Sequence, residues 1–482
     1  MRLRTSLPAV VVFVLACARL SAQSPPLSPE FQVNTSTTNY QAQSSVSMDD
    51  AGNFVVVWES YQTGDSDVFA QRFDTKGTPI GGEFRVNTYT TNYQGHPSVA
   101  ANLDGSFVVA WSSYNQNEVK GTNIYAQRYD TSGSPAGGEF RVNTYTTGYQ
   151  YGPSVASDAN GNFVVVWSSY LQDGDLGGVY GQVFDNTGSP VNGEFRANQF
   201  TTGYQWRPSV AYGGNGDFVV AWESQGQDGD GYAVMARRYA PDGTPRADEF
   251  QVNQQTTGDQ SAPAVAADSG GDFVVTWHSA GQDGSEFGIM ARRFGSSGVA
   301  AGAEFQVNTY TTDYQTYPRI GMDAKGNFLI AWRSFGQDGD AAGTDAQRFD
   351  ASTARVGSEF QVNTTTTGYQ DQAALALGRG GRFVITWSSP DSGSDSEIWA
   401  RMASPLPAPM QVDPVPPSRP ASPQGVAQNG ILEPGESVTV SPSWTNNTPN
   451  ALALTGTASN FTGPAGAVYT LTDASANYGS IA

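Results

Sequence analysis

Pairs of aspartates separated by one glycine recur in the loop pattern QDGD, shortly after a tryptophan. Calcium is bound by about six to eight oxygens, and alternating Asp with Gly places carboxylates and free backbone carbonyls near one point. We therefore predict a possible calcium site in these loops, with the ligands Asp173, Asp175, Asp228, Asp230, Asp338 and Asp340. Two carboxylates do not complete a calcium shell, so backbone, water or a neighbouring loop would have to contribute. The alternative is a turn in which Asp and Gly serve only the backbone geometry.

A second recurrent pattern, TTxYQ, combines a tyrosine with a glutamine. In a four-stranded unit this connection and the loop after the tryptophan lie at the same end, so aromatic, amide and carboxylate groups would gather on one face. Such a set suits carbohydrate binding. The predicted ligand-binding residues are Tyr93, Gln94, Tyr149, Gln150, Tyr204, Gln205, Trp206, Tyr314, Gln315, Tyr369 and Gln370. The alternative is that a glutamine present in every unit is structural and bonds between units.

Residues typical of acid–base and nucleophilic catalysis are scarce. The chain has two histidines, His96 and His278, which excludes a histidine-rich metal site, and neither stands in a recognisable triad motif. His278 follows a tryptophan at a position that differs between units, and we expect it at the surface. Single departures from the repeat, at Trp206, Arg207 and His96, are the only hints of a catalytic centre.

The elements that would position these residues repeat along the chain. Tryptophans, each ending an apolar run such as FVVVW, recur roughly every 55 residues, which indicates a repeat architecture. They are Trp58, Trp111, Trp167, Trp222, Trp277, Trp332 and Trp387. Each unit contains four strand candidates bounded by Gly-containing turns. Long helical periodicity is absent, so the sequence predicts an all-β fold.

The apolar run of each unit predicts a strand covered on both faces, whereas the alternation in EFxVN predicts a half-solvated strand. The first EFxVN copy precedes the first tryptophan, and no good copy follows Trp387. We therefore predict that the strand around Phe31 joins the last unit and closes a ring. The competing assignment uses MQVD, from Met410, as the missing copy.

Seven four-stranded units with an exchanged terminal strand resemble a seven-bladed β-propeller. The EFxVN, FVVxW and QDGD motifs resemble repeats of uncharacterised secreted bacterial proteins, similar in outline to the FG-GAP and kelch types. The resemblance covers residues 29–402. It lacks the DxDxDG calcium loop of FG-GAP repeats and an in-register kelch glycine pair, so it assigns no residue roles.

The segments outside the repeats have their own signatures. Residues 1–22 read as a secretory signal peptide, and we favour cleavage near Ala22 over lipoprotein anchoring at Cys17. Residues 403–422 form a proline-rich linker. Residues 423–482 resemble the opening strands of an immunoglobulin-like β-sandwich, too few for a complete one, which leaves open whether the chain is a fragment.

The formal net charge of −20 argues against nucleic acid and anionic lipid as partners. Because the units are so similar, we predict a secreted or cell-surface binding module without catalytic activity, monomeric, and presenting its repeated loops to a glycan or protein. Two alternatives remain open: an extracellular glycan hydrolase or lyase built on the same ring, and a purely structural spacer.

Overall fold

The computed structural model describes residues 27–116, 120–390 and 395–403, together with the backbone of 452–457 and 475–481. The chain divides into two compact units, one of which comprises Gln23–Pro405. In the other unit the described backbone forms one antiparallel pair, β29 (Leu452–Thr457) and β30 (Ser475–Ile481). The predicted signal peptide and linker lie outside the described residues, as does most of the predicted sandwich.

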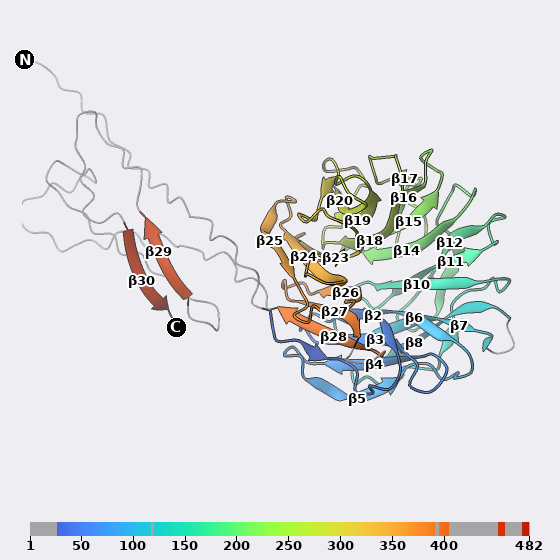
Figure 1. Cartoon of the computed structure of the whole chain (residues 1–482). Helices are drawn as coiled ribbons and strands as arrows, with labels where there is room; N and C mark the ends of the chain where they lie inside the picture. Colours follow the sequence, from blue (N-terminus) through green and yellow to red (C-terminus); the bar gives the residue numbers. More distant parts are fainter. Residues whose placement is uncertain (1–26, 117–119, 391–394, 404–451, 458–474, 482) are drawn as a thin grey trace, which may run out of the picture. The chain divides into compact units, whose positions relative to one another are not determined.

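Gln23–Pro405 contains seven antiparallel sheets of four strands, arranged in a ring (Figure 1). The first strand of each sheet packs against the first strands of the sheets on either side, so these strands surround the axis. The innermost strands are β2 (Gln41–Met48), β6 (Gln94–Ala101), β10 (Gln150–Ser157), β14 (Gln205–Tyr212), β18 (Gln260–Ala267), β22 (Gln315–Met322) and β26 (Asp371–Leu377). This is a seven-bladed β-propeller, as the repeat predicted, and the blades are numbered below in this order.

The second strands carry the repeated tryptophans. They are β3 (Phe54–Ser60), β7 (Phe107–Tyr114), β11 (Phe163–Tyr170), β15 (Phe218–Gln225), β19 (Phe273–Ala280), β23 (Phe328–Phe335) and β27 (Phe383–Pro390). Every residue of β3 is buried, and each of the seven tryptophans is at most 1% exposed. The prediction of a strand covered on both faces is confirmed, because apolar layers between neighbouring blades form the core.

The third strands are β4 (Asp67–Phe73), β8 (Thr122–Tyr129), β12 (Gly177–Phe184), β16 (Tyr232–Tyr239), β20 (Phe287–Phe294), β24 (Ala342–Phe349) and β28 (Ser396–Ala403). The outermost strands are β5 (Pro79–Arg85), β9 (Phe140–Arg141), β13 (Pro190–Arg196), β17 (Phe250–Gln251), β21 (Phe305–Gln306), β25 (Arg355–Gln361) and β1 (Phe31–Gln32). Their side chains are largely half-buried or exposed, which matches the alternation of EFxVN.

The N-terminal strand closes the ring. β1 pairs antiparallel with β28, so that Phe31 faces Ala400 and Gln32 faces Trp399, and it forms the outer edge of the seventh sheet. The ring of Phe31 also lies 5.6 Å from that of Phe73 in the first blade. The predicted exchange of the terminal strand is therefore confirmed, while the competing MQVD segment lies outside the described residues.

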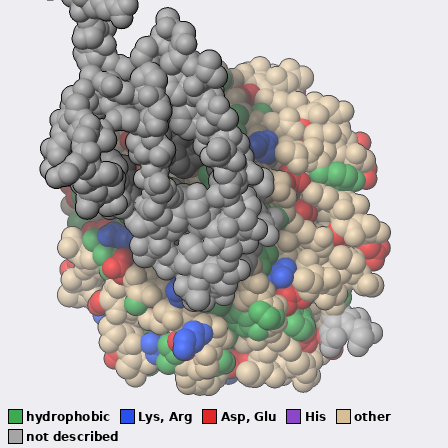
Figure 2. Space-filling view, turned by 90° about the vertical axis from the view of Figure 1, so that its left-hand side faces the viewer, with side chains coloured by type: hydrophobic (Ala, Val, Ile, Leu, Met, Phe, Trp, Pro, Cys, Tyr) green, Lys and Arg blue, Asp and Glu red, His purple; other side chains and the backbone are tan. Residues whose placement is uncertain are grey.

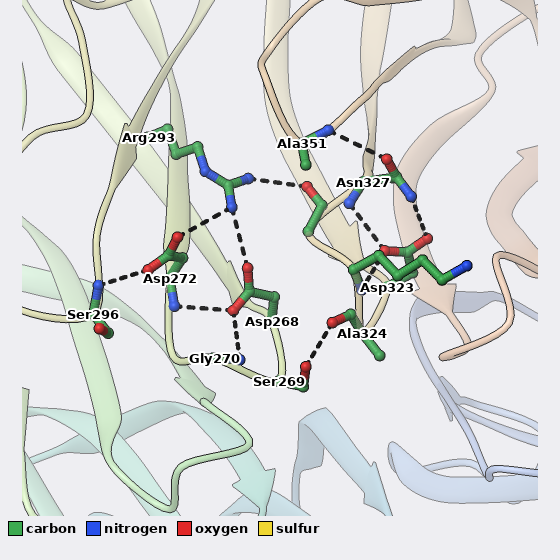
Figure 3. A network of polar contacts seen from close by, with 12 residues as sticks. Asp268, Ser269, Gly270, Asp272, Arg293, Ser296, Asp323, Ala324, Asn327 and Ala351 are labelled. Carbon is green, nitrogen blue, oxygen red and sulfur yellow. Dashed lines mark hydrogen bonds and ion pairs between the residues drawn. The ribbon is translucent and has the colours of Figure 1, made fainter.

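The turn between the first and second strands has a glycine with positive φ in every blade, as predicted: Gly52, Gly105, Gly161, Gly216, Gly271, Gly326 and Gly381. Polar networks join neighbouring blades at this end of the ring (Figure 3). Arg293 pairs with Asp268 at 3.1 Å and donates to the carbonyl of Gly326 in the next blade. The charged groups of this network are thus engaged in holding blades together.

Candidate active site at one end of the ring

Each innermost strand begins with a β-bulge at the opposite end of the ring from the glycine turns. The bulge residue, which is the third residue of the first six of these strands and the second of β26, has φ between 49° and 60°. This is a left-handed conformation that is unusual for residues other than glycine. These residues are Gln43, His96, Gly152, Arg207, Ala262, Tyr317 and Gln372. The bulge turns the backbone N–H of this residue toward the preceding blade, where it needs an acceptor.

The residue after the repeated tryptophan supplies that acceptor across the blade boundary. The side chains of Glu59, Ser112, Ser168, Glu223 and His278 accept the bulge N–H groups of His96, Gly152, Arg207, Ala262 and Tyr317, at 3.3, 3.1, 3.1, 2.8 and 3.4 Å respectively. The residue type after the tryptophan therefore differs among these five blades, but its side chain accepts the same hydrogen bond in each of them.

The expectation that His278 lies at the surface is wrong. Its side chain is 7% exposed, because it fills this joint between blades, and its Nδ1 atom accepts from Tyr317. Burial, reinforced by Arg207 and Arg333, lowers the pKa of His278 to about 3. The ring is therefore neutral at neutral pH, and its remaining proton lies on Nε2.

The sixth blade departs from this arrangement. Arg333 follows its tryptophan and has no acceptor atom. Instead, Asp371 receives Arg333 Nη1 at 2.8 Å, and its other oxygen accepts the bulge N–H of Gln372 at 2.6 Å. The Oε1 atom of Gln372 accepts the bulge N–H of Gln43 at 2.6 Å, which completes the ring. We call the blade-specific side chains gathered here the axial cluster: Glu59, Tyr93, His96, Tyr151, Trp206, Arg207, Glu223, His278, Tyr317, Arg333 and Asp371.

One part of the axial cluster is a tyrosine–histidine pair. The phenol oxygen of Tyr151 is hydrogen-bonded to Nε2 of His96, and the two rings meet edge to face with centroids 4.3 Å apart. Behind them, Glu59 accepts the phenol O–H of Tyr93 at 2.9 Å. Burial lowers the pKa of His96 to about 4 and raises that of Tyr151, and Glu59 adds to the rise. Both members of the pair are therefore uncharged at neutral pH.

The other part of the axial cluster surrounds Tyr317. The guanidinium of Arg333 lies 4.8 Å from the centroid of its ring, and that of Arg207 lies 5.8 Å away. Arg207 belongs to β14, two blades from β22, so its side chain reaches past the intervening blade. Its guanidinium is 3.8 Å from Glu223, whose pKa burial raises.

The predicted ligand-binding glutamines turn out to be buried. Gln94, Gln150, Gln205, Gln315 and Gln370 are 0% exposed, and each donates to a backbone carbonyl of its own TTxYQ loop. They hold the turn that starts the innermost strand of their own unit, and these five bonds do not run between units as the structural alternative expects. Ligand binding by the glutamines stays a prediction. The tyrosines differ: Tyr149, Tyr314 and Tyr369 are exposed, Tyr93 and Tyr204 are half-buried, and sugar binding by them remains a prediction.

The predicted metal ligands all have protein partners. In each QDGD loop the first carboxylate accepts an asparagine side chain, and the second accepts a backbone N–H from the following TTxYQ loop. For example, Asp173 accepts Asn198 at 3.1 Å, and Asp175 accepts the N–H of Gly203 at 2.8 Å. The same holds for Asp228, Asp230, Asp338 and Asp340. Within the described residues no group of three or more Asp, Glu, His or Cys is placed to hold a metal. Calcium binding therefore stays a prediction.

Sequence reasoning pointed to Tyr93, His96, Trp206 and Arg207, placed His278 at the surface, and missed the rest of the axial cluster. One signal was present: the residue after the tryptophan and the two residues after the TTxYQ glutamine change between units while their neighbours hardly change. What was missing was the bulge, which brings these positions from successive blades together.

The fold and this site define a seven-bladed propeller with blade-specific polar side chains at one axial end. No protein-family model and no curated protein matches the chain. Among solved structures it is similar to a protein of unknown function from Dyadobacter fermentans, at 10% identity and TM-score 0.48, covering 77% of this chain and 97% of that one. It is also similar to the polysaccharide lyase Uly1, at 10% identity and TM-score 0.47, covering 76% and 90%. A third similar structure is an α-L-arabinanase from Penicillium chrysogenum, at 14% identity and TM-score 0.44, covering 67% of this chain and 99% of that one.

At these sequence identities the comparisons show a similar fold only, and they do not assign a reaction to this chain. They do correct one expectation, that the chain is not an enzyme. Structures named as a lyase and an arabinanase match the ring, so a ring of this shape does not exclude catalysis. The premise that the units are too alike also fails at the axial cluster, where the side chains differ from blade to blade. Among the described residues, no helix is long and apolar enough to cross a membrane.

Proposed function

We propose that this chain is an exported glycan-active enzyme whose active site is the axial cluster, and that it cleaves by elimination. The observation that carries the proposal is the hydrogen-bonded pair of Tyr151 and His96. An accessible phenol joined to a neutral imidazole can accept a proton from a substrate and pass a proton on. Tyr151 is 45% exposed, so its oxygen is within reach of a ligand.

Hydrolysis is supported less well, because it uses two carboxyl groups that flank the scissile bond. The two glutamates of the axial cluster are 3% and 2% exposed. Glu59 accepts Tyr61, Tyr93 and the N–H of His96, and Glu223 accepts the N–H of Ala262. Both are therefore committed inside the ring, whereas the phenol is open to solvent.

Elimination on a uronate sugar proceeds without an external reactant. The phenol oxygen of Tyr151 takes the proton from the carbon next to the carboxylate, while its own proton moves to His96. The electron pair of that C–H bond forms a C=C bond, and the C–O bond to the leaving sugar breaks. The leaving oxygen keeps the bonding pair and takes up a proton from a water molecule. The imidazolium of His96 then returns its proton to the hydroxide that remains, which restores the neutral imidazole and the water. Both neutral groups start in the protonation states that this sequence of steps needs.

The test is a screen of uronate-containing and neutral polysaccharides with two readouts, ultraviolet absorbance of the new C=C bond and release of reducing ends. We expect both signals together on a uronate polymer. Reducing ends without the absorbance would replace elimination by hydrolysis. Absence of both signals over the whole panel would reject the enzyme.

A further inference from the structure

Arg319 occupies a position that other blades fill with serine. It lies on β22, two residues after the bulge at Tyr317. In the first four blades this position is Ser45, Ser98, Ser154 and Ser209, and each hydroxyl accepts a backbone N–H of the next innermost strand. The position therefore faces the neighbouring strands around the axis. In the sixth blade it holds a guanidinium instead.

Within the part of the chain that the structure describes, the Arg319 guanidinium forms no ion pair. Its Nη1 atom donates only to the carbonyl of Pro318, at 3.0 Å, and its side chain is exposed. The two neighbouring arginines differ, since Arg333 pairs with Asp371 at 2.8 Å and Arg207 lies 3.8 Å from Glu223. Three cations thus share two carboxylate partners here, in a chain whose net charge is −20.

Arg207 and Arg319 also act on one another. Although solvent reaches the Arg319 side chain, the surrounding protein atoms desolvate its guanidinium and lower its pKa. The charge of Arg207 adds to this lowering, and the charge of Asp371 opposes it. Arg207 comes from the fourth blade and Arg319 from the sixth, and Arg207 lies against the ring of Tyr317, which precedes Arg319 by two residues. An anion that contacts the guanidinium groups of both arginines would offset the repulsion between them.

We propose that Arg319 and Arg207 bind the anionic group, a carboxylate or a sulfate ester, of an acidic glycan at the axial end of the ring. Guanidinium groups suit this task because their planar N–H donors match the oxygens of such groups. The ring of Tyr317 beside them offers a flat apolar surface to the sugar. The inference rests on the proposed function, since it names the substrate class of the same site.

The repeat itself supplies well-matched variants. Arg319→Ser introduces the residue of the first four blades, and Arg207→Gln introduces the residue that the first and seventh blades carry at this bulge. Arg246→Gln is the control, because Arg246 is an exposed arginine paired with Asp217 away from the axial cluster. Each of the three substitutions removes one positive charge. A difference in polyanion binding between the variants is therefore due to where the charge lies and not to the net charge.

Binding is measured by affinity electrophoresis of the full chain in gels that contain polygalacturonate, dextran sulfate or neutral dextran. We expect retardation by at least one polyanion and none by dextran, because a chain of net charge −20 is repelled by polyanions unless it has a specific site. Arg319→Ser and Arg207→Gln should weaken binding by about tenfold or more, and Arg246→Gln should not. The polymer that retards the protein identifies carboxylate or sulfate.

Equal retardation of wild type and Arg319→Ser would overturn the site, as would retardation by dextran alone. The screen for cleavage separates the two proposals. Cleavage of a neutral glycan without polyanion binding removes the anion site and replaces elimination by hydrolysis, but keeps a glycan-active enzyme. Polyanion binding that depends on Arg319, without cleavage of any polymer, keeps the anion site and removes the enzyme.

Discussion

The carboxylate of Glu223 in the fourth blade accepts the backbone N–H of Ala262 in the fifth blade at 2.8 Å. Ala262 has φ of 50° at its bulge. Glu223 thus links the assembly of the ring to the charge balance of the axial cluster, since it also lies beside Arg207.

Removing this acceptor should destabilise the ring. We expect Glu223→Ala to lower the free energy of unfolding by about 1–3 kcal/mol, because it leaves a buried N–H without a partner. Glu223→Ser is the matched variant, since Ser112 and Ser168 each accept the equivalent bulge N–H of the next blade. Urea denaturation should show most of the loss restored in the serine variant. Equal stability of the alanine variant and wild type would contradict a structural role.

Removing one phenol oxygen should abolish cleavage without unfolding the chain. Tyr151→Phe deletes the hydrogen bond to His96, and we expect a loss of kcat of about 100-fold or more. The melting temperature should hardly change, because the side chain is 45% exposed. Tyr170→Phe is the control, as an exposed tyrosine outside the axial cluster and outside the TTxYQ loops. Equal losses in both variants would argue against a specific role for Tyr151.

Asp345 makes stability depend on pH. This residue is 1% exposed, and burial, followed by the charges of Glu359 and Asp338, raises its pKa to about 8. The unfolded chain releases the proton near pH 4, while the folded chain holds it up to about pH 8, so stability falls as pH rises between these values. Asp345→Met introduces the side chain found at the same place in two blades, Met235 and Met290.

We expect the methionine variant to be more stable than wild type at pH 7 by roughly 2–4 kcal/mol, with a smaller gain at pH 4.5. Urea denaturation at the two pH values measures both. A gain that is the same at both pH values would show that packing, rather than the proton, is responsible.

The QDGD loops make a separate prediction about calcium. Each carboxylate already accepts a hydrogen bond from the protein, as Asp228 does from Asn253 and Asp230 from Gly258. Calcium must compete with these hydrogen bonds. If it binds as predicted, the melting temperature is higher with added calcium than with a chelator, because a ligand that binds only the native state stabilises it. A rise with calcium that Asp230→Asn removes would establish the metal site.

Much of the ring could be predicted from sequence because its signals are local. Burial on both faces shows in FVVVW, the left-handed turn shows in Gly161 and its equivalents, and closure shows in the displaced strand at Phe31. The axial cluster depends on contacts between blades. The residues next to His278 in the sequence do not indicate that its Nδ1 atom faces the bulge at Tyr317 in the next blade. The sequence pattern therefore predicts a surface position for His278, which is wrong.

Surface charge gives no comparable guide to the site. On the face drawn in Figure 2, the described acidic and basic side chains are scattered among uncharged ones. The informative charges are instead those that differ between equivalent positions, such as Arg319 against Ser209.

The bulge at the start of each innermost strand restricts which side chains can follow the tryptophan. In five blades that position must accept a hydrogen bond, and it holds Glu, Ser or His. Two of these three residue types also exchange protons readily. The need for a hydrogen-bond acceptor between blades therefore places acid–base side chains at this end of the ring. A catalytic centre then requires only a few further substitutions at neighbouring positions.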